Sequence, residues 1–551
     1  MNEIKTSCAS TDRKWSTWES IDWNKCEIAV NKLQARIVKA QKAGKHGKVK
    51  SLQWVLTHSF YAKALAVKRV TSNSGSDTAG VDKVKWSTPN ARFKAIGELK
   101  RRGYKPQPLK RVNIKKSNGK LRPLGIPTMK DRAMQALYLL ALEPVSETTA
   151  DSNSYGFRKE RSTGDAREQC FCVLAKKTSP EWIMEGDIKG CFDHISHEWL
   201  LNNIPMDKVM LRKWLKCGFV FNKELFPTEE GTPQGGIISP TLANMTLDGL
   251  QTMLAEKYHK KFVNRKTIYY PKVHLVRYAD DFIITGRSKE ALEEIKPLVV
   301  DFLKERGLTL SEEKTKITHI DDGFDFLGYN IRKYKGVLLI KPSQKSLKKF
   351  MQKIRGIIDS NKGSKQESLI RLLNLVITGW VNYYKNCVAS DTFRKADYLI
   401  FEKLWQWAKR RHPKKGKYWI ADRYFTRVKN RNWCFVANFK KGKTDDRIAL
   451  KRLYDTKITR YVKIKGEANP FDPEWTEYFE KRKTYKMLQS LNGRKSLLYM
   501  WERQNHLCPV CGKPIDKEHP WGTSQQIVNG KKVNFLLHDS CRRKVIQTNK
   551  M

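Results

Sequence analysis

The stretch Leu275-Val276-Arg277-Tyr278-Ala279-Asp280-Asp281-Phe282-Ile283-Ile284 decides how this chain folds and what chemistry it can perform. Apolar, β-prone residues flank two adjacent acids, a pattern typical of a tight strand–turn–strand that carries carboxylates out of a buried sheet. Carboxylates on an apolar scaffold are costly unless a cation neutralises them, and a divalent metal ion is the usual partner. A solvated turn is the alternative for an isolated Asp-Asp pair.

A third acid, in a segment of the same character, favours the metal site over the solvated turn. Trp182-Ile183-Met184-Glu185-Gly186 predicts a short strand that ends at Asp187, before a glycine-containing turn and a helical stretch. Nucleotide polymerisation uses carboxylates from separate strands to hold two metal ions about 3.5–4 Å apart. Because Mg²⁺ takes few carboxylates and adds substrate phosphates to its shell, three acids suffice.

Asp187 and the Tyr-Ala-Asp-Asp motif together resemble the palm of a reverse transcriptase, and their surroundings resemble the proteins encoded within group II introns. Further motifs of that family follow in order: an N-terminal extension motif at 77–82, a fingers hairpin at 115–127, a second fingers motif at 154–158, a Gly-Thr-Pro-Gln-Gly-Gly loop at 231–236, a palm motif at 308–316 and a primer-grip hairpin at 324–329. A chance match of the full ordered set is implausible.

The resemblance implies a role for each residue of the acidic site. Asp187 and Asp280 would bind two Mg²⁺ ions, Asp281 would complete the site, and Ile188 would offer a backbone carbonyl. The nucleophile would be the 3′-hydroxyl of the primer, so catalysis would consist mainly of positioning and charge neutralisation.

The resemblance also implies contacts to the incoming deoxynucleoside triphosphate. The expected contact residues are Lys116, Arg122, Phe192, Gln234 and Lys314. Lys116 and Arg122 would grip phosphates, Gln234 would lie beside the nucleotide, and Lys314 would support the triphosphate. Phe192 would block a ribose 2′-hydroxyl, which favours deoxynucleotides. An ordinary core Phe and an exposed structural Lys are the alternatives for Phe192 and Lys314.

The chain carries far more positive than negative charge. Its 551 residues include 107 Lys and Arg against 56 Asp and Glu, which gives a formal net charge of +51. Such an excess indicates a polyanionic partner, and binding should weaken steeply with salt because each neutralised phosphate releases counterions. The resemblance names group II intron RNA and target DNA as the partners.

The expected fold is an α+β multidomain arrangement with the organisation of a right-hand polymerase. Five regions are expected in order: an N-terminal RNA-binding extension at 1–60, fingers and palm with an antiparallel palm sheet at 61–335, a helical thumb or X (maturase) domain at 340–428, a basic DNA-binding region at 429–495 and a small zinc-binding tail at 496–551. Trp433 is one of the aromatic residues of the expected DNA-binding region.

Apolar residues at helical spacing predict a helix bundle after Pro342. One stripe consists of Leu347, Phe350, Ile354, Ile357 and Ile358, and the next of Leu369, Leu372, Leu373, Val376 and Trp380. Both stripes are interpreted as bundle core. By resemblance to the X domain, aromatic planes interleaved with basic residues would bind intron RNA through stacking and phosphate contacts. The expected contacts are Trp380, Tyr383, Tyr384, Lys409, Arg410 and Arg411.

Two residue pairs near the C-terminus have the spacing of zinc ligands. The expected ligands are Cys508, Cys511, His538 and Cys541. Four ligands in two such pairs match a closed, tetrahedral structural zinc site. His506 and His519 are rival fourth ligands, and free buried thiols are the alternative to metal binding.

The same tail resembles a degenerate HNH endonuclease domain, with Asn534 ahead of the second ligand pair. A nuclease of that class needs a His general base and further His or Asp ligands for its catalytic metal. The stretch 515–535 contains only His519, and Arg542 and Ile546 stand where later His residues are expected. We therefore expect the nuclease to be inactive or lost and a zinc-stabilised DNA-binding tail to remain.

The sequence shows no 18-residue apolar span and no signal-peptide pattern, so we expect a soluble protein without a membrane partner. Its 11 cysteines are mostly scattered singly, which indicates free thiols in a reducing compartment. The bacterial cytoplasm or nucleoid is the expected location, with an organelle as the alternative.

The expected function is that of an RNA-directed DNA polymerase and splicing maturase of a mobile group II intron. As a maturase, the protein would stabilise the folded ribozyme and perform no splicing chemistry itself. A maturase that only binds RNA is one alternative, and the intact acidic motifs oppose it. A reverse transcriptase recruited to another bacterial system is the other, and the X-domain motifs and HNH-like tail oppose that one.

Overall fold

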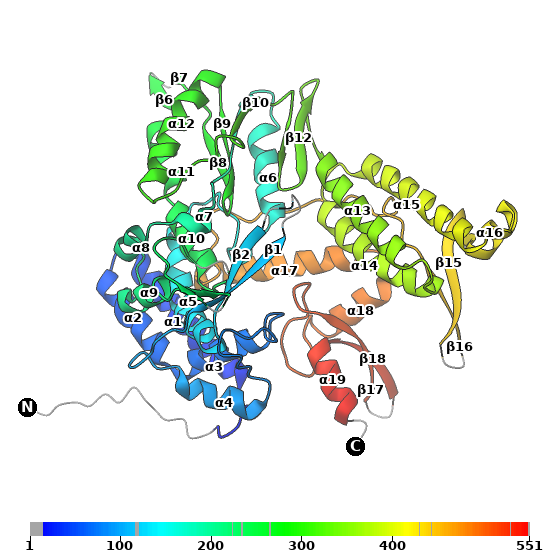
Figure 1. Cartoon of the computed structure of the whole chain (residues 1–551), viewed down its shortest axis with the longest axis horizontal. Helices are drawn as coiled ribbons and strands as arrows, with labels where there is room; N and C mark the ends of the chain where they lie inside the picture. Colours follow the sequence, from blue (N-terminus) through cyan, green and yellow to red (C-terminus); the bar gives the residue numbers. More distant parts are fainter. Residues whose placement is uncertain are drawn as a thin grey trace, which may run out of the picture. The chain divides into compact units, whose positions relative to one another are not determined.

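The turn that carries Asp280 lies at the tip of a hairpin in a four-stranded antiparallel sheet (Figure 1). The strands are β8 (His274–Tyr278), β9 (Asp281–Gly286), β3 (Trp182–Gly186) and β10 (Lys316–His319), in the order β10-β3-β9-β8. β3 pairs with both β9 and β10, so the strand that precedes Asp187 is central in the sheet. The strand–turn–strand and the strand before Asp187 are therefore present as predicted.

The structure is a computed structural model. It describes residues 15–115, 119, 121–222, 224–232, 235–263, 266–428, 430–441, 444–528 and 531–548. The chain divides into two compact units, Met1–Glu467 and Ala468–Met551, and the four-stranded sheet belongs to the first. Within the described ranges, no helix combines enough length with enough apolar character to span a bilayer.

Helices pack on the four-stranded sheet and form the core with it. α12 (Lys289–Lys304) contacts β3 and β9, whereas α6 (Thr163–Leu174) and α11 (Leu250–Lys257) contact β8. The sequence of α12 explains its placement, because its apolar residues recur at helical spacing and are buried on one face. These buried residues are Leu292, Ile295, Val299, Phe302 and Leu303.

A cluster of N-terminal helices surrounds α5 (Met129–Thr149). The cluster consists of α1 (Trp23–Lys42), α2 (His46–His58), α3 (Phe60–Thr71) and α4 (Pro89–Glu98). α5 contacts α1, α2 and α3 and is buried on most of its surface, as its largely apolar sequence requires. Four shorter helices complete this part: α7 (Cys191–His194), α8 (His197–Asn203), α9 (Lys208–Leu215) and α10 (Ser239–Leu247).

A second sheet carries the predicted basic hairpin. Its strands are β1 (Leu109–Lys115), β2 (Leu121–Ile126), β4 (Phe219–Phe221) and β5 (Glu224–Phe226), in the order β2-β1-β4-β5. β1 and β2 pair antiparallel from Lys115↔Leu121 outwards, which confirms the hairpin strands. A separate hairpin is formed by β6 (Lys261–Val263) and β7 (Lys266–Tyr269).

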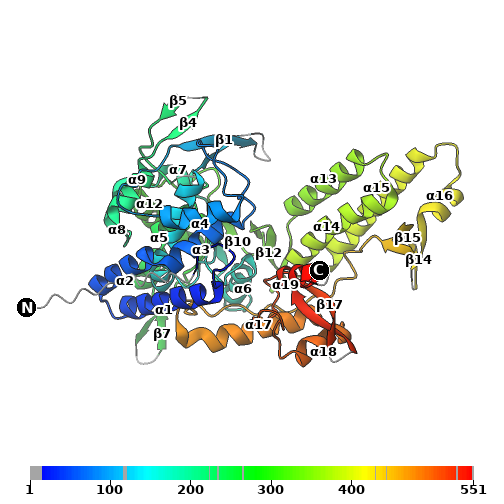
Figure 2. The same ribbon diagram turned by 90° about the horizontal axis from the view of Figure 1, so that it is seen from below.

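A three-stranded sheet leads into a bundle of three helices. The elements are β11 (Phe324–Phe326), β12 (Tyr329–Tyr334), β13 (Val337–Pro342), α13 (Gln344–Ser360), α14 (Gln366–Tyr384) and α15 (Ser390–Arg411). Figures 1 and 2 both show the three helices lying alongside one another. The helix bundle predicted after Pro342 is therefore present.

The two predicted apolar stripes differ in how well they match the core. On α13, Leu347, Phe350, Ile354 and Ile358 are buried as predicted, whereas Ile357 is half-buried. On α14, Leu369 and Leu373 are buried, but Leu372 is 42% exposed, and the buried positions continue instead at Ile370, Ile377 and Val381. The α14 stripe is therefore wrong at Leu372, because the buried face turns toward Ile370.

A small antiparallel sheet follows the bundle and packs on α14. Its elements are α16 (Lys417–Tyr424), β14 (Phe425–Val428), β15 (Arg431–Lys441) and β16 (Thr444–Ala449). The sequence predicted a DNA-binding region from 429 onward. In the structure, β15 and β16 belong to the same compact unit as the bundle, and the boundary between units falls after Glu467.

The chain then returns from the bundle to α6 as an extended strap, residues 459–466. The Thr459 N–H donates to the Lys385 carbonyl at 3.0 Å, just beyond the end of α14. The Ile464 N–H donates to Asp165 Oδ1 at 2.8 Å, within the first turn of α6. The strap thus joins the C-terminal end of α14 to α6, a helix that packs on the four-stranded sheet.

The second unit is built around the predicted ligand pairs. Its elements are the 3-10 helix η1 (Pro473–Trp475), α17 (Thr476–Leu491), α18 (Lys495–Arg503), β17 (Trp521–Val528), β18 (Lys531–His538) and α19 (Asp539–Thr548). Its core consists of Met487, Leu491, Trp501, Cys508, Ile515, Leu536, Leu537 and Cys541. Because this core is small, we expect cross-linking by a metal ion to matter for its stability.

Candidate active site

A two-residue turn brings two acids to the tip of the β8–β9 hairpin. Ala279 has a φ of +58°, and the chain reverses so sharply that Tyr278 pairs with Asp281. A Cβ at Gly156 would lie 2.4 Å from the Ala279 nitrogen. Only glycine permits such an approach, so the motif around Gly156 fixes the position of the acidic turn.

The register of β3 and β9 brings the third acid to the same place. Gly186 pairs with Phe282, so that Asp187, the next residue, comes level with Asp281. A Cβ at Gly186 would lie 2.2 Å from the Phe282 ring, and this close packing also requires glycine. The structure therefore brings Asp187, Asp280 and Asp281 together from two neighbouring strands.

Burial and mutual repulsion disfavour the ionised form of these carboxylates. Burial raises the pKa of Asp281 to about 6, and the charges of Asp280 and Asp187 add to the rise. Burial also raises the pKa of Asp280, while the positive charges of Arg122 and Lys314 act in the opposite direction. Converging carboxylates of this kind favour a bound cation, and their hard oxygen atoms fit Mg²⁺.

Lys314 supplies one positive charge at this site. Its ammonium lies 2.7 Å from Asp187 Oδ2, and this hydrogen bond raises the pKa of Lys314. The side chain is 65% exposed, so the ammonium can also reach solvent-borne anions. Ile188 bridges to Leu310, and the neighbouring Ser311 N–H donates to the Asp187 carbonyl at 2.8 Å. These contacts place the 308–316 motif directly beside the carboxylates.

The remaining predicted nucleotide contacts lie on three elements around the acids. Arg122 is exposed on β2, and its charge acts on Asp280. Phe192 lies on α7, where its ring meets Phe157 edge to face with 6.2 Å between centroids. Lys116 and Gln234 lie outside the described residues.

Two described residues of the 231–236 motif, Thr232 and Gly235, lie against α7 and β2. The Thr232 N–H donates to the Phe192 carbonyl at 2.7 Å. Gly235 has a φ of +116°, and a Cβ there would lie 2.7 Å from the Gly125 carbonyl oxygen. Glycine at this position therefore lets the loop lie against the β1–β2 hairpin, which also carries Arg122.

A buried ion pair beneath the acidic turn was missed by the sequence reasoning. Arg277 on β8 is 1% exposed and pairs with Asp248. It also donates to Asn244 Oδ1 at 3.3 Å and to the Ala279 carbonyl at 3.4 Å. The guanidinium thus links the turn to the end of α10. An arginine in the middle of an apolar strand is the sequence feature that could have pointed to a buried ion pair.

Two of the aromatic rings predicted to bind RNA pack inside the helix bundle. Tyr384 is 3% exposed, and its hydroxyl lies 2.5 Å from Ser346 Oγ. Trp380 stacks on Phe350 with 4.5 Å between ring centroids. Tyr384 is therefore buried, whereas Trp380 is half-buried and lines a surface pocket with Lys349 and Lys353.

The third ring joins the bundle to the β11–β12 hairpin. Tyr383 stacks on Tyr329 with 5.3 Å between centroids and donates its hydroxyl hydrogen to the Leu327 carbonyl at 2.8 Å. Tyr383 is 37% exposed, so one edge of its ring also faces solvent. These contacts fix the start of the bundle on the predicted primer-grip hairpin.

The basic residues predicted to bind RNA lie at the C-terminal end of α15. Lys409 and Arg410 are exposed. Arg411 instead donates to the carbonyls of Lys362 and Ser364, at 3.0 and 2.8 Å. The structure therefore leaves Lys409 and Arg410 open to a partner and uses Arg411 to fasten the loop between α13 and α14.

Four ligand atoms gather in the second unit. Those of Cys508, Cys511, His538 and Cys541 all lie within 4.8 Å of one another. The His538 Nε2 atom lies 3.1 Å from the Pro514 carbonyl, and its Nδ1 atom lies 3.3 Å from Cys511 Sγ. A metal-bound histidine usually donates its other ring N–H to such an oxygen. Three sulfurs and one imidazole nitrogen fit a tetrahedral zinc ion.

The two rival histidines have other partners. His506 stacks on Trp501 with 3.7 Å between ring centroids. His519 lies 2.9 Å from Asp516 Oδ1 through its Nδ1 atom. Neither belongs to the four-residue cluster, so His538 is the histidine that the structure offers as fourth ligand. The HNH ancestry of this unit stays a prediction.

The antiparallel sheet, its converging carboxylates and the basic hairpin beside them define the class of nucleotide polymerases. Three family models match the chain in order: the N-terminal domain of reverse transcriptase at 18–99, reverse transcriptase (RNA-dependent DNA polymerase) at 114–331, and the group II intron maturase-specific domain at 347–425. The chain therefore belongs to the reverse transcriptase and maturase proteins of group II introns.

Two curated relatives are similar to this chain. The chain is 35% identical to protein YkfC of Escherichia coli over 49% of its own length and 79% of that protein. It is 34% identical to the group II intron-encoded protein LtrA of Lactococcus lactis over 49% of its length. The match spans 54% of LtrA, about half of that relative.

A solved telomerase from Candida tropicalis, in complex with a fragment of telomeric RNA, shares 16% identity with a TM-score of 0.34. That match covers 55% of this chain and 58% of the telomerase chain. The likeness is too distant to support a functional conclusion.

Proposed function

We propose that this protein copies RNA into DNA and promotes the splicing of a group II intron. The proposal is based on the position of the three acids within the matched regions. Asp187, Asp280 and Asp281 converge on one sheet inside the region matched by the reverse transcriptase model, and a maturase-specific region follows in the same chain. The substrates are then deoxynucleoside triphosphates, and the macromolecular partners are intron RNA and target DNA.

In this proposal the four-stranded sheet is the palm, and the β1–β2 hairpin belongs to the fingers. The helix bundle α13–α15 is the thumb and the RNA-binding domain. Arg122, Lys116 and Gln234 contact the incoming nucleotide, and Phe192 lies under its sugar and disfavours a 2′-hydroxyl. Two features support this arrangement: the charge of Arg122 acts on Asp280, and the Thr232 N–H donates to the Phe192 carbonyl.

Asp187 and Asp280 would hold two Mg²⁺ ions, Asp281 would complete the acidic site, and the Ile188 carbonyl would lie beside it. When bound, Mg²⁺ supplies Lewis-acid activation of the primer 3′-hydroxyl and neutralises charge on the phosphates. The protein's own part is positional, because the hairpin and its neighbours hold the carboxylates rigidly before substrate arrives. Lys314 stabilises Asp187 and can pair with a nucleotide phosphate instead.

The second unit is proposed to bind one structural zinc ion through Cys508, Cys511, His538 and Cys541 and to contact DNA without cleaving it. The compact ligand cluster supports the zinc ion. The absence of nuclease chemistry rests on the sequence, since Arg542 and Ile546 replace expected histidines. A protein of this kind would prime DNA synthesis from an existing strand, such as a nascent strand at a replication fork.

A maturase that only binds RNA is the second candidate, and the intact acidic site argues against it. The net charge of +51 supports an RNA partner under both candidates. None of the ten described cysteines forms a disulfide, which supports a reducing compartment such as the bacterial cytoplasm or an organelle.

A paired assay of DNA synthesis and splicing tests the proposal. Wild-type protein should extend a DNA primer on an RNA template and should accelerate splicing of its intron at low Mg²⁺. The variant Asp280→Asn should lose extension and keep splicing, because maturase binding uses other surfaces. Extension that survives Asp280→Asn would remove the catalytic assignment, and a wild-type protein that accelerates splicing without extension would favour the binding-only maturase.

A further inference from the structure

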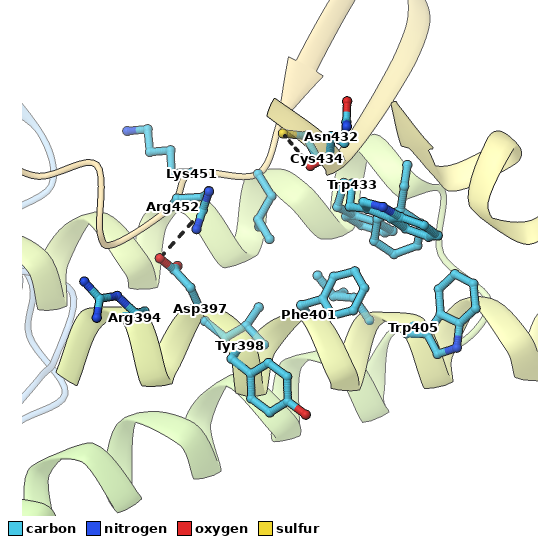
Figure 3. A pocket seen from close by; sticks show the side chains of 15 residues that line it. Arg394, Asp397, Tyr398, Phe401, Trp405, Asn432, Trp433, Cys434, Lys451 and Arg452 are labelled. Atoms are coloured by element: carbon cyan, nitrogen blue, oxygen red, sulfur yellow. Dashed lines mark hydrogen bonds and ion pairs between the residues drawn. The ribbon is translucent and has the colours of Figure 1, made fainter. Parts of the chain in front are cut away.

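An aromatic pocket of about 650 Å³ lies between α15 and the β14–β15 hairpin. Its floor and walls carry the rings of Phe401, Trp405, Phe425 and Trp433. Figure 3 shows Phe401 and Trp405 on α15 and Trp433 on the strand opposite, with the rings facing a common space. The volume is that of an ordinary small-ligand site, and neither the sequence motifs nor the polymerase mechanism uses it.

A β-bulge points Trp433 into this pocket. β14 and β15 pair at Thr426↔Cys434 and at Val428↔Arg431, so the register shifts by one residue between the two pairs. Trp433 lies inside the shift, with a φ of +60° and 55% of its side chain exposed. A bulky residue in the left-handed region is strained, and such strain persists at sites of function.

The surrounding charges make the pocket attractive to an anion with a flat apolar part. Arg394, Lys451 and Arg452 line its rim. Asp397 is the one acid of the lining, and its carboxylate accepts hydrogen bonds from the N–H groups of Leu453 and Tyr454 at 2.9 and 3.0 Å. Arg452 Nε also lies 3.8 Å from Asp397 Oδ2 (Figure 3), so one rim cation is paired with the acid, and the lining carries three cations against this one acid.

We propose that this pocket binds an unpaired nucleobase of RNA, with the flanking phosphates held by the basic rim. The inference deepens the proposed function, because it assigns a base-binding site within the maturase region. Aromatic planes beside arginine and lysine suit a base extruded from a loop or bulge. An apolar peptide fits the rim less well, since peptides do not carry a negative charge at every unit.

RNA is the nucleic acid assigned to the pocket because most of its walls belong to the maturase-specific match. Residues 347–425 supply α15 and Phe425, and Trp433 follows eight residues after Phe425. The sequence alone placed Trp433 in a region expected to bind DNA. In the structure, its ring instead packs beside Phe401 and Trp405 on α15 of the helix bundle.

Binding of a fluorescent single-stranded oligouridine to the full-length protein tests this assignment. We expect Trp433→Ala to weaken binding about tenfold, because one base–aromatic stack is lost. Trp433→Phe should restore most of the affinity. The control Trp419→Ala removes another partly exposed Trp of the same unit, outside the pocket lining, and should change binding little. An oligonucleotide with abasic positions should bind wild type as weakly as oligouridine binds Trp433→Ala.

Three outcomes would overturn the assignment: equal binding of normal and abasic RNA, unchanged affinity in Trp433→Ala, or equal competition by a DNA oligonucleotide of matching sequence. Primer extension on the same preparations keeps this test separate from the proposed polymerase. Trp433→Ala should extend primers as wild type does. If RNA affinity is unchanged while extension is normal, the pocket assignment fails and the polymerase stands. If wild type neither binds RNA nor extends, both fail.

Discussion

The two candidate metal sites of this protein are built in opposite ways. Asp187 follows β3, whereas Asp280 and Asp281 lie on the β8–β9 hairpin far along the chain, and the three acids form a cluster that stays open to substrate. Cys508, Cys511, His538 and Cys541 form a closed set with all four ligand positions filled by protein. Open positions are characteristic of catalytic metal sites and closed ones of structural sites.

The two sites therefore depend on different parts of the chain. The acidic cluster depends on strand register and on glycine contacts with neighbouring motifs, so distant changes can disturb it. The Cys/His cluster depends on two local turns and one hairpin. A catalytic defect should therefore leave the second unit intact, and loss of zinc should leave the carboxylates in place.

The largest expected effect follows from removing one carboxylate of the open site. Asp187→Asn should slow primer extension about a thousandfold or more, because charge stabilisation by preorganised groups is lost. The extension rate at saturating substrate measures this, and the zinc content per chain should stay at one. The matched control is Asp301→Asn, an exposed acid on α12. A rate equal to that of the control would show that the carboxylates do not act in catalysis.

Removing one ligand of the closed site should produce the reverse pattern. Cys508→Ser should abolish zinc binding and unfold the second unit, since structural zinc contributes on the order of 10 kcal/mol to such domains. Metal analysis and limited proteolysis measure the two effects, while extension of a short primer should be retained. Cys172→Ser, which changes an exposed free cysteine, is the control. Unchanged zinc content in Cys508→Ser would mean that the ligand set is wrong.

A smaller effect is expected where a neighbouring motif supports the acidic turn. Gly156→Ala places a Cβ 2.4 Å from the Ala279 nitrogen, so the turn must shift. A displacement of about 1 Å can cost about a hundredfold in rate, and we expect a loss of that size in extension. Gly97→Ala on α4, where nothing lies within 4 Å, should keep full activity. Equal rates for both variants would show that the Gly156 contact does not position the acids.

The smallest effect should come from the exposed cation of the open site. Lys314→Ala should raise the KM for deoxynucleotides about fivefold and leave kcat nearly unchanged, because an exposed ion pair contributes little. Steady-state kinetics with varied nucleotide concentration measures KM and kcat separately. Lys304→Ala on α12 is the control. A large fall in kcat would instead place Lys314 in the chemical step.

Local patterns allowed much of the open site to be predicted. The apolar flanks of Asp280 and the strand before Asp187 both mark short buried strands, and the structure contains them. The contact between Arg277 and Asp248 could not be predicted in the same way. It joins a strand to a helix end 29 residues earlier, and nothing local reveals which acid neutralises a buried arginine.

Tertiary packing determines the fourth ligand of the Cys/His cluster, the buried face of α14 and the bulge at Trp433, which local patterns did not predict. Three histidines were available for the zinc site, and the β17–β18 hairpin selects His538 by carrying it to the cysteines. Leu372 was expected in the core of α14, but that helix is apolar around much of its circumference, so its neighbours decide which side is buried. The bulge at Trp433 is a one-residue shift of register, which periodicity does not detect.

The strap of residues 459–466 has a mechanical consequence for the helix bundle. The bundle leaves the rest of its unit through β13, and the strap ties Lys385 after α14 to Asp165 of α6 through the Thr459 and Ile464 N–H groups. Arg167 on α6 also donates to the Asn386 carbonyl at 2.6 Å, so the base of the bundle is held at several points. A base fastened in this way keeps this end of the bundle from swinging away from α6 while the strap stays in place.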